Sequence, residues 1–181
     1  KWVHLSNSGG ALNNLNPGCN MTRVGLALYG INPLQSVIPA KAGININTAR
    51  SELDPRLHGN DKGIKPVLKL TTKIIQIKSL QKGDMAGYDR TFTAKKAMTV
   101  GILPLGYHDG VDRRLSNKGV VMVKGVECPI IGLVSMNVTV IDISKVKNPQ
   151  IGQKVVVYSD NPSDKNSIEN AAKICKTIPY D

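Results

Sequence analysis

The chain has 181 residues, of which 41% are hydrophobic and 20% are charged, so it can bury the core of a globular domain. Its apolar runs are far shorter than the roughly 18 residues that a membrane-spanning helix needs, and its first residues lack a signal-peptide pattern, so we expect a cytoplasmic protein with no membrane partner. Only 4% of the residues are aromatic, whereas valine, isoleucine and leucine are abundant, which predicts a mainly β fold with an aliphatic core.

The cysteines and the charged residues bear on disulfides, on metal binding and on nucleic-acid binding. Cys19, Cys128 and Cys175 lie far apart and form no C-x-x-C pair, which argues against a disulfide framework and against a zinc site, and we expect no metal. The net charge of +11 favours weak association with polyanions. Because the lysines are not interleaved with aromatic residues, we expect no specific nucleic-acid binding.

Residues 1–33 have the pattern of the end of a larger unit. Trp2 to Leu5 begin in the middle of a strand-like pattern, and Val24 to Tyr29 form a short apolar run typical of a buried parallel strand. A pattern that starts so abruptly lacks preceding partner strands. We therefore expect that the first part of this unit is missing from the chain.

Residues 34–64 have a different texture, with three glycines, two prolines and no sustained hydrophobic period. A segment of this length without a period is too long for a connection inside a compact domain, so we interpret it as an inserted mobile segment. Its stretches 36–44 and 53–62 resemble a translated palindromic repeat found inside some bacterial genes, and we assign no chemistry to them.

Residues 65–181 have the pattern of a compact β-domain. Lys124-Gly125 is expected to form a hairpin turn, and Ser167 is expected to cap a helix of about ten residues. On that helix Ile168, Ala171, Ala172 and Cys175 share one face. Strands are expected at 66–80, 98–105, 120–123, 128–134, 138–143 and 154–158.

Two tyrosines stand in site-like positions. Tyr88 follows Gly87, and nineteen residues later Tyr107 follows Gly106, each near a strand end where glycine lets the backbone approach a ligand closely. The alternative is that both tyrosines only anchor strand ends through satisfied hydroxyls.

A second candidate site lies near the start of the chain. A hydroxyl and two glycine amides in the segment 7–10 could hold an anion, and Arg23 and Gly25 add a cation and another close approach. These residues suggest a phosphorylated cofactor, although such short segments are also found as plain turns.

Together these motifs resemble the C-terminal portion of a bacterial alanine racemase. The resemblance implies a C-terminal β-barrel-like domain over 65–181, preceded over 1–33 by the last strands and helix of a truncated (β/α)8 barrel that binds pyridoxal 5'-phosphate (PLP). The stretches that match the family's motifs in identity and spacing are 4–8, 23–30, 87–92, 106–113 and 132–137.

The resemblance assigns roles to the residues of the first part. Ser8 would bind the cofactor phosphate, and the backbone of Gly25 and Leu26 would contact the same phosphate. Arg23 would face the pyridine nitrogen, and His4 would orient Arg23 through a hydrogen bond. The lysine that holds PLP covalently in the family has no counterpart in this chain, so we expect the chain alone to be inactive.

The resemblance also assigns roles within the β-domain. Tyr88 would be the catalytic base from the second subunit, and the backbone of Met136 would contact the substrate carboxylate. Tyr107, Asp109 and Arg113 would line the entrance corridor. Leu133 and Asn137 depart from the family, which usually has arginine and aspartate there, so the charge of the corridor is altered.

The resemblance implies an isomerase that interconverts L- and D-alanine and supplies D-alanine for peptidoglycan, working as a homodimer of complete chains or with a complementing N-terminal fragment. One alternative is another barrel-type PLP enzyme, such as an amino-acid decarboxylase. The spacing of the tyrosines and the Ser135-Met136 step favour the racemase. Another alternative is a non-catalytic β-domain or gene remnant, which the abrupt ends and the insertion favour.

Overall fold

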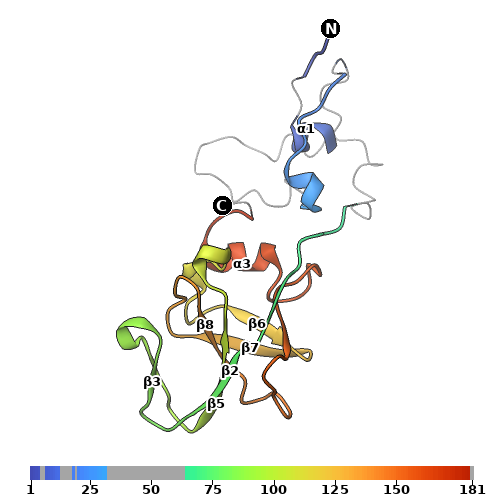
Figure 1. Ribbon diagram of the computed structural model, residues 1–181. Coiled ribbons are helices and arrows are strands. Elements are labelled where there is room, and N and C mark those ends of the chain that lie inside the picture. Colours follow the sequence, from blue (N-terminus) through green and yellow to red (C-terminus); the bar gives the residue numbers. More distant parts are fainter. Residues whose placement is uncertain (5–6, 13–17, 19, 32–63, 180–181) are drawn as a thin grey trace. The chain divides into compact units, whose positions relative to one another are not determined.

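The computed structural model describes residues 1–4, 7–12, 18, 20–31 and 64–179. The chain divides into two compact units, a first over residues 1–67 and a second over residues 68–179 (Figure 1). The expected insertion, 34–64, lies outside the described residues except for Ile64.

The first unit contains the helix α1, Ser8–Leu12, and the 3-10 helix η1, Leu26–Tyr29. The prediction of a buried strand over Val24–Tyr29 is therefore wrong. Gly25 accepts a hydrogen bond from Leu28 N (2.9 Å), and Gly30 adopts a left-handed φ of 72° that ends the turn. Because glycine brackets the apolar run at both sides, the run coils instead of extending, and Leu28 is left 69% exposed.

The second unit is a β-domain whose main sheet has seven strands in the order β1-β9-β6-β7-β8-β5-β2. All its paired strands are antiparallel. The strands of this sheet are β1 (Leu70–Lys73), β2 (Gln76–Leu80), β5 (Met98–Leu103), β6 (Val120–Val123), β7 (Val126–Ile131), β8 (Thr139–Asp142) and β9 (Lys154–Tyr158).

The two edge strands of this sheet, β1 and β2, are neighbours in the chain, so the sheet curls on itself. They are joined by Ile74 and Ile75, whose backbone amides donate hydrogen bonds to different neighbouring segments. Ile74 N donates to Gln153 O (3.0 Å), and Ile75 N donates to Ile102 O (2.9 Å). The single strand predicted over 66–80 is thus two strands, because the segment must pair with β9 before Ile74 and with β5 after Ile75.

A small hairpin stands apart from the main sheet at one side of the β-domain (Figure 1). It pairs β3, Met85–Ala86, with β4, Phe92–Thr93, around the 3-10 helix η3, Tyr88–Arg90. The sequence did not predict this hairpin, because strands of two residues are too short to show an alternating pattern.

Aliphatic side chains fill the curled sheet, as the composition predicted. Ile74, Leu103, Ile141 and Val155 are among the fully buried side chains. The helix α3, Ile168–Cys175, lies at one end of the curled sheet (Figure 1). No helix within the described ranges is long and apolar enough to cross a membrane.

The capped helix and its apolar face are confirmed. Ser167 Oγ accepts a hydrogen bond from Asn170 N (3.3 Å), which begins α3. Ala171, Ala172 and Cys175 are buried, and Ile168 packs against the same core.

The hairpin turn at Lys124-Gly125 is also confirmed and gives a test of the fold. Both residues have positive φ, 50° and 75°, as a primed turn requires. Gly125→Ala should lower the free energy of unfolding by about 1 kcal/mol, because alanine resists this conformation. Lys124→Asn should raise it by a few tenths of a kcal/mol, because asparagine tolerates positive φ.

Urea midpoints of the two variants measure both changes, and the opposite signs make each variant the control for the other. A loss of stability in Lys124→Asn equal to that in Gly125→Ala would contradict the assigned turn.

Candidate functional site

In the first unit, hydrogen bonds join residues near the start of the chain to residues 20–25 and bring Ser8 to Gly25. Val3 O accepts from Asn20 N (3.1 Å), and Ser8 Oγ accepts from Gly25 N (2.9 Å). The partners in each pair are 17 residues apart in the chain. Ser8 is 7% exposed, so its hydroxyl is held in place by packing as well as by this bond.

The other residues of this group are placed less tightly. Leu26 follows Gly25 as the first residue of η1, so its backbone begins beside the Ser8 hydroxyl. Arg23 and His4 are exposed. Among the described residues, no hydrogen bond joins His4 to Arg23, so the orienting bond implied by the resemblance is not seen. The structure brings Ser8, Gly25 and Leu26 together.

In the β-domain, Tyr88 is presented by a contact between two glycines. A Cβ atom on Gly87 would lie 2.8 Å from Gly132 Cα, and both glycines have positive φ, 80° and 70°. Only glycine fits two backbones this close in these conformations. The contact fixes the β3–β4 hairpin against the loop 132–138 and leaves the Tyr88 side chain 69% exposed.

Tyr107 lies on a second turn that is bound to the same loop. In the 3-10 helix η4, Tyr107–Asp109, the amide of Tyr107 donates to Ser135 O (3.0 Å) and that of His108 donates to Met136 O (3.0 Å). A Cβ atom on Gly106 would lie 2.1 Å from Ser135 O. The turn can therefore reach the Ser135-Met136 backbone only because residue 106 has no side chain.

Asp109 and Arg113 also act within this turn. Asp109 Oδ2 accepts from Gly106 N (2.9 Å), which closes the turn on itself. Arg113, at the start of the 3-10 helix η5, Arg113–Leu115, places its guanidinium carbon 5.9 Å from the centre of the Tyr107 ring. This distance is that of a cation–π pair. The structure thus joins three of the residues that were predicted to line one corridor.

Two polar side chains that were not predicted from the sequence hold the loop 132–138 in place, and a third binds the backbone just before the Tyr107 turn. Asn117 Oδ1 accepts from Gly132 N (2.7 Å), and Ser116 Oγ accepts from Val134 N (2.9 Å). Thr139, which is 1% exposed, donates from Oγ1 to Leu105 O (2.7 Å). A Ser-Asn pair after a helical turn is a weak signal that sequence reasoning could have used, since asparagine tolerates positive φ and Asn117 has 57°.

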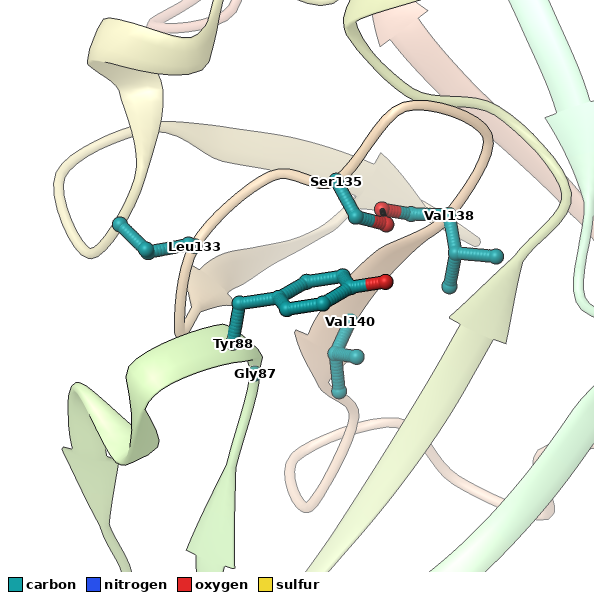
Figure 2. A pocket seen from close by; sticks show the side chains of 6 residues that line it. All are labelled: Gly87, Tyr88, Leu133, Ser135, Val138 and Val140. Atoms are coloured by element: carbon teal, nitrogen blue, oxygen red, sulfur yellow. Dashed lines mark hydrogen bonds between the residues drawn. The ribbon is translucent and has the colours of Figure 1, made fainter.

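An open pocket of about 360 Å³ lies beside Tyr88. Figure 2 shows the Tyr88 ring lying across it, with Val138 and Val140 on the side of the hydroxyl. Leu133, which stands where the resembled family usually has arginine, makes one wall of the pocket apolar. The remaining lining residues are Gly87 and Ser135.

Asp112, which lies between η4 and η5, forms an ion pair with Arg114. Its carboxylate accepts from Arg114 Nε (2.9 Å) and Nη2 (2.6 Å). These bonds hold the pKa of Asp112 below its ordinary value, although burial acts in the opposite direction. By contrast, burial raises the pKa of the Cys128 and Cys175 thiols to about 11, so both stay protonated at neutral pH. No group of three metal-binding side chains occurs within the residues that the structure describes.

Comparison with known proteins identifies the family of the chain. The model of the alanine racemase C-terminal domain matches residues 67–181. The chain belongs to the alanine racemase family. Relatives include the alanine racemase of Borreliella burgdorferi, 37% identical over the whole of this chain, and that of Lactobacillus acidophilus, 33% identical over the whole of this chain. The chain spans 42% and 43% of the lengths of these two relatives.

Solved structures support the same assignment. The alanine racemase of E. faecalis is 29% identical with a TM-score of 0.75, and the match covers 99% of this chain and 42% of that one. The enzyme of Bartonella henselae with covalently bound pyridoxal phosphate is 27% identical with a TM-score of 0.74, over 99% of this chain and 43% of that one. The predicted β-barrel-like C-terminal domain of alanine racemase is thereby confirmed, and the match favours the racemase over the decarboxylase alternative.

The close approach of the Tyr107 turn to the loop 132–138 gives a test by substitution. Gly106→Ala should lower the free energy of unfolding by about 3 kcal/mol, because its Cβ would meet the Ser135 carbonyl and the turn would have to move away. Gly110→Ala, in the same turn, is the matched control, because nothing lies within 4 Å of its Cβ and only its φ of 95° is strained. It should cost about 1 kcal/mol. Equal losses in urea denaturation would contradict the close contact.

The bond between Asp112 and Arg114 predicts a specific pH dependence. Because folding lowers the pKa of Asp112, the ionised carboxylate contributes stability above the ordinary pKa of about 4, and this contribution is lost as the pH falls below it. Asp112→Asn should therefore lower stability at pH 6 and change it much less at pH 3. Denaturation midpoints at the two pH values measure the difference, and an equal loss at both would contradict the ionic role.

Proposed function

We propose that the protein to which this chain contributes interconverts L- and D-alanine by moving the proton on Cα, with PLP as its cofactor. The observation that carries the proposal is the placement of Tyr88. Its phenol is exposed on a hairpin that two glycines fix against the loop of Met136. An exposed acid–base group held by backbone contacts is suited to reach a substrate in a neighbouring subunit.

The residues of the first unit fit the phosphate of PLP. The Ser8 hydroxyl and the start of η1 lie within one hydrogen bond of each other, and a Cβ built on Gly25 would meet nothing within 4 Å. A phosphate can therefore approach this backbone closely. When bound, PLP supplies an electron-withdrawing ring that makes the Cα proton of an amino acid easier to remove.

Each residue of this chain would act at a defined place. Ser8 Oγ and the amide of Leu26 would bind the phosphate, and the Gly25 amide would join them by exchanging its bond to Ser8 Oγ for one to a phosphate oxygen. Arg23 would donate a hydrogen bond to the ring nitrogen and, because arginine keeps its own proton, would leave that nitrogen unprotonated. His4 would support Arg23 in this role.

In the β-domain, Tyr88 Oη would take the Cα proton on one face of the substrate in one direction of the reaction and return it in the other. Met136 would bind the substrate carboxylate through its backbone. Tyr107, Asp109 and Arg113 would line the route by which alanine enters.

The proposed reaction needs a second acid–base group that this chain does not supply. Racemisation needs an acid–base group on each face of the substrate, and Tyr88 supplies only one. The lysine that provides the other in the family has no match in this chain, so the chain alone would be inactive. The active form would be a cytoplasmic homodimer of complete chains, or this chain with a complementing N-terminal fragment, and its product would serve peptidoglycan synthesis.

A fusion tests this function. The N-terminal portion of the Borreliella burgdorferi alanine racemase, joined to this chain, should bind PLP and racemise alanine, whereas this chain alone should not. In the fusion, Tyr88→Phe should slow racemisation by about 10²- to 10⁴-fold. In D2O the variant should still incorporate deuterium at Cα of one enantiomer and not of the other, because one of two face-specific bases remains.

Tyr29→Phe is the matched control, since it removes the hydroxyl of another exposed tyrosine that has no proposed role. Equal slowing of deuterium incorporation into both enantiomers by Tyr88→Phe would show that Tyr88 is not a face-specific base. A folded fusion that binds PLP and does not racemise alanine would overturn the proposed reaction.

A further inference from the structure

Tyr158, near the end of β9, is a buried tyrosine that the proposed reaction does not use. It is 6% exposed. Its hydroxyl donates a hydrogen bond to Gly110 O (3.1 Å) and accepts one from Asp112 N (3.3 Å). One hydroxyl therefore binds two backbone groups on either side of Val111, and a phenylalanine ring in the same place would bind neither.

The segment that Tyr158 holds joins the two halves of the cation–π pair. Tyr107 precedes it in η4, and Arg113 follows it as the first residue of η5. Val111, in the middle of the segment, is 1% exposed and belongs to the core. Backbone bonds from Gly110 N to Tyr107 O (3.3 Å) and from Val111 N to Gly106 O (3.1 Å) close η4 at the start of this segment. Beyond them, the path of the chain to Arg113 is held by the buried Val111 side chain and by the two bonds of the Tyr158 hydroxyl.

We propose that Tyr158 is a positioning residue that sets the Arg113 guanidinium over the Tyr107 ring. This inference rests on the proposed function only where it concerns catalysis, because there Tyr107 and Arg113 line the route of the substrate. Arg113 is a fixed cation at that route, and the carboxylate of an amino acid is attracted to it. Loss of the Tyr158 hydroxyl should therefore weaken the capture of substrate more than the proton transfer itself.

The chemistry of the site keeps the hydroxyl able to act in this way. Burial raises the pKa of Tyr158 above the ordinary value of a phenol. The hydrogen bond from the Asp112 amide acts in the opposite direction, and the charge of the Asp112 carboxylate adds to the increase. The hydroxyl therefore remains protonated at neutral pH and can donate to Gly110 O. The groups that face it are the Asp112 carboxylate and the Cys175 thiol of α3, and the thiol also stays protonated at neutral pH.

Tyr158→Phe in this chain tests the positioning by NMR. The variant should show at least tenfold faster hydrogen exchange of the Asp112 amide, which loses its acceptor. The side-chain protons of Arg113 should lose the shift that the Tyr107 ring induces. Ile143→Val is the control, since it removes one buried methyl group at a cost of about 1 kcal/mol and touches neither bond. It should leave both signals unchanged.

Should Tyr158→Phe fail to fold, the same substitution is made with Lys124→Asn, which is expected to restore part of the stability. Unchanged Arg113 signals in a folded Tyr158→Phe variant would overturn the inference, whatever happens to the stability.

Kinetics of the fusion separate this inference from the proposed function. Tyr158→Phe should raise the KM for alanine about two- to fivefold, the value of one cation–π contact, with kcat within a factor of two. A fall in kcat with KM unchanged would overturn the inference. A fusion that binds PLP without racemising alanine would refute the proposed function alone, because the NMR result decides the positioning of Arg113 by itself.

Discussion

Close contact between backbones at glycine is the constraint on which the candidate site depends. The Tyr88 hairpin, the Tyr107 turn and the loop 132–138 are far apart in the sequence, and they touch at Gly87, Gly106 and Gly132. A Cβ atom on any of the three glycines would lie less than 3.0 Å from backbone atoms of the neighbouring segment, so the two segments would have to separate. The two tyrosines therefore owe their relative placement to residues that have no side chain.

Polar side chains hold these segments in place by hydrogen bonds to their backbone. Asn117 binds the backbone of the loop 132–138 at Gly132, Thr139 binds Leu105 O just before the Tyr107 turn, and Tyr158 binds the segment between η4 and η5. In each case a side chain from the β-barrel satisfies a backbone group that has no strand partner, which removes the cost of burying it unpaired. The turns and the loop that carry the exposed site residues are thus fixed by hydrogen bonds from these side chains.

The sequence predicts those parts of the fold that local signals determine. The strands β6 and β9, the Lys124-Gly125 turn and the helix capped by Ser167 were all found as expected, because each depends on alternation, turn chemistry or capping within a few residues. The prediction of a strand over Val24–Tyr29 is wrong, because the effect of the neighbouring glycines on the backbone outweighs the apolar content of the run. The closure at Ile74-Ile75 was not visible, because it arises from partners distant in sequence.

The residues of the candidate site also differ in whether a local sequence pattern identifies them. Residues with a motif, such as Tyr88 and Met136, can be identified from the sequence, and their chemical roles remain predictions. Asn117, Thr139 and Tyr158 could not be identified, because their importance lies in the backbone groups they reach and not in any local pattern.

The junction at Ile74-Ile75, where β1 and β2 bring together the two edges of the curled sheet, affects how the β-domain forms during synthesis. Of the two strands that flank these residues, β2 pairs with β5, which follows soon after, and β1 pairs with β9, the last of the described strands to be synthesised. On the ribosome β2 finds its partner early, whereas β1 carries an unpaired edge until Tyr158 has emerged. Closing that large loop is the slow, entropically costly step of a non-local β topology. A nascent chain that stalls before β9 would thus present an open sheet with a free edge at β1 to any chain that can pair with it.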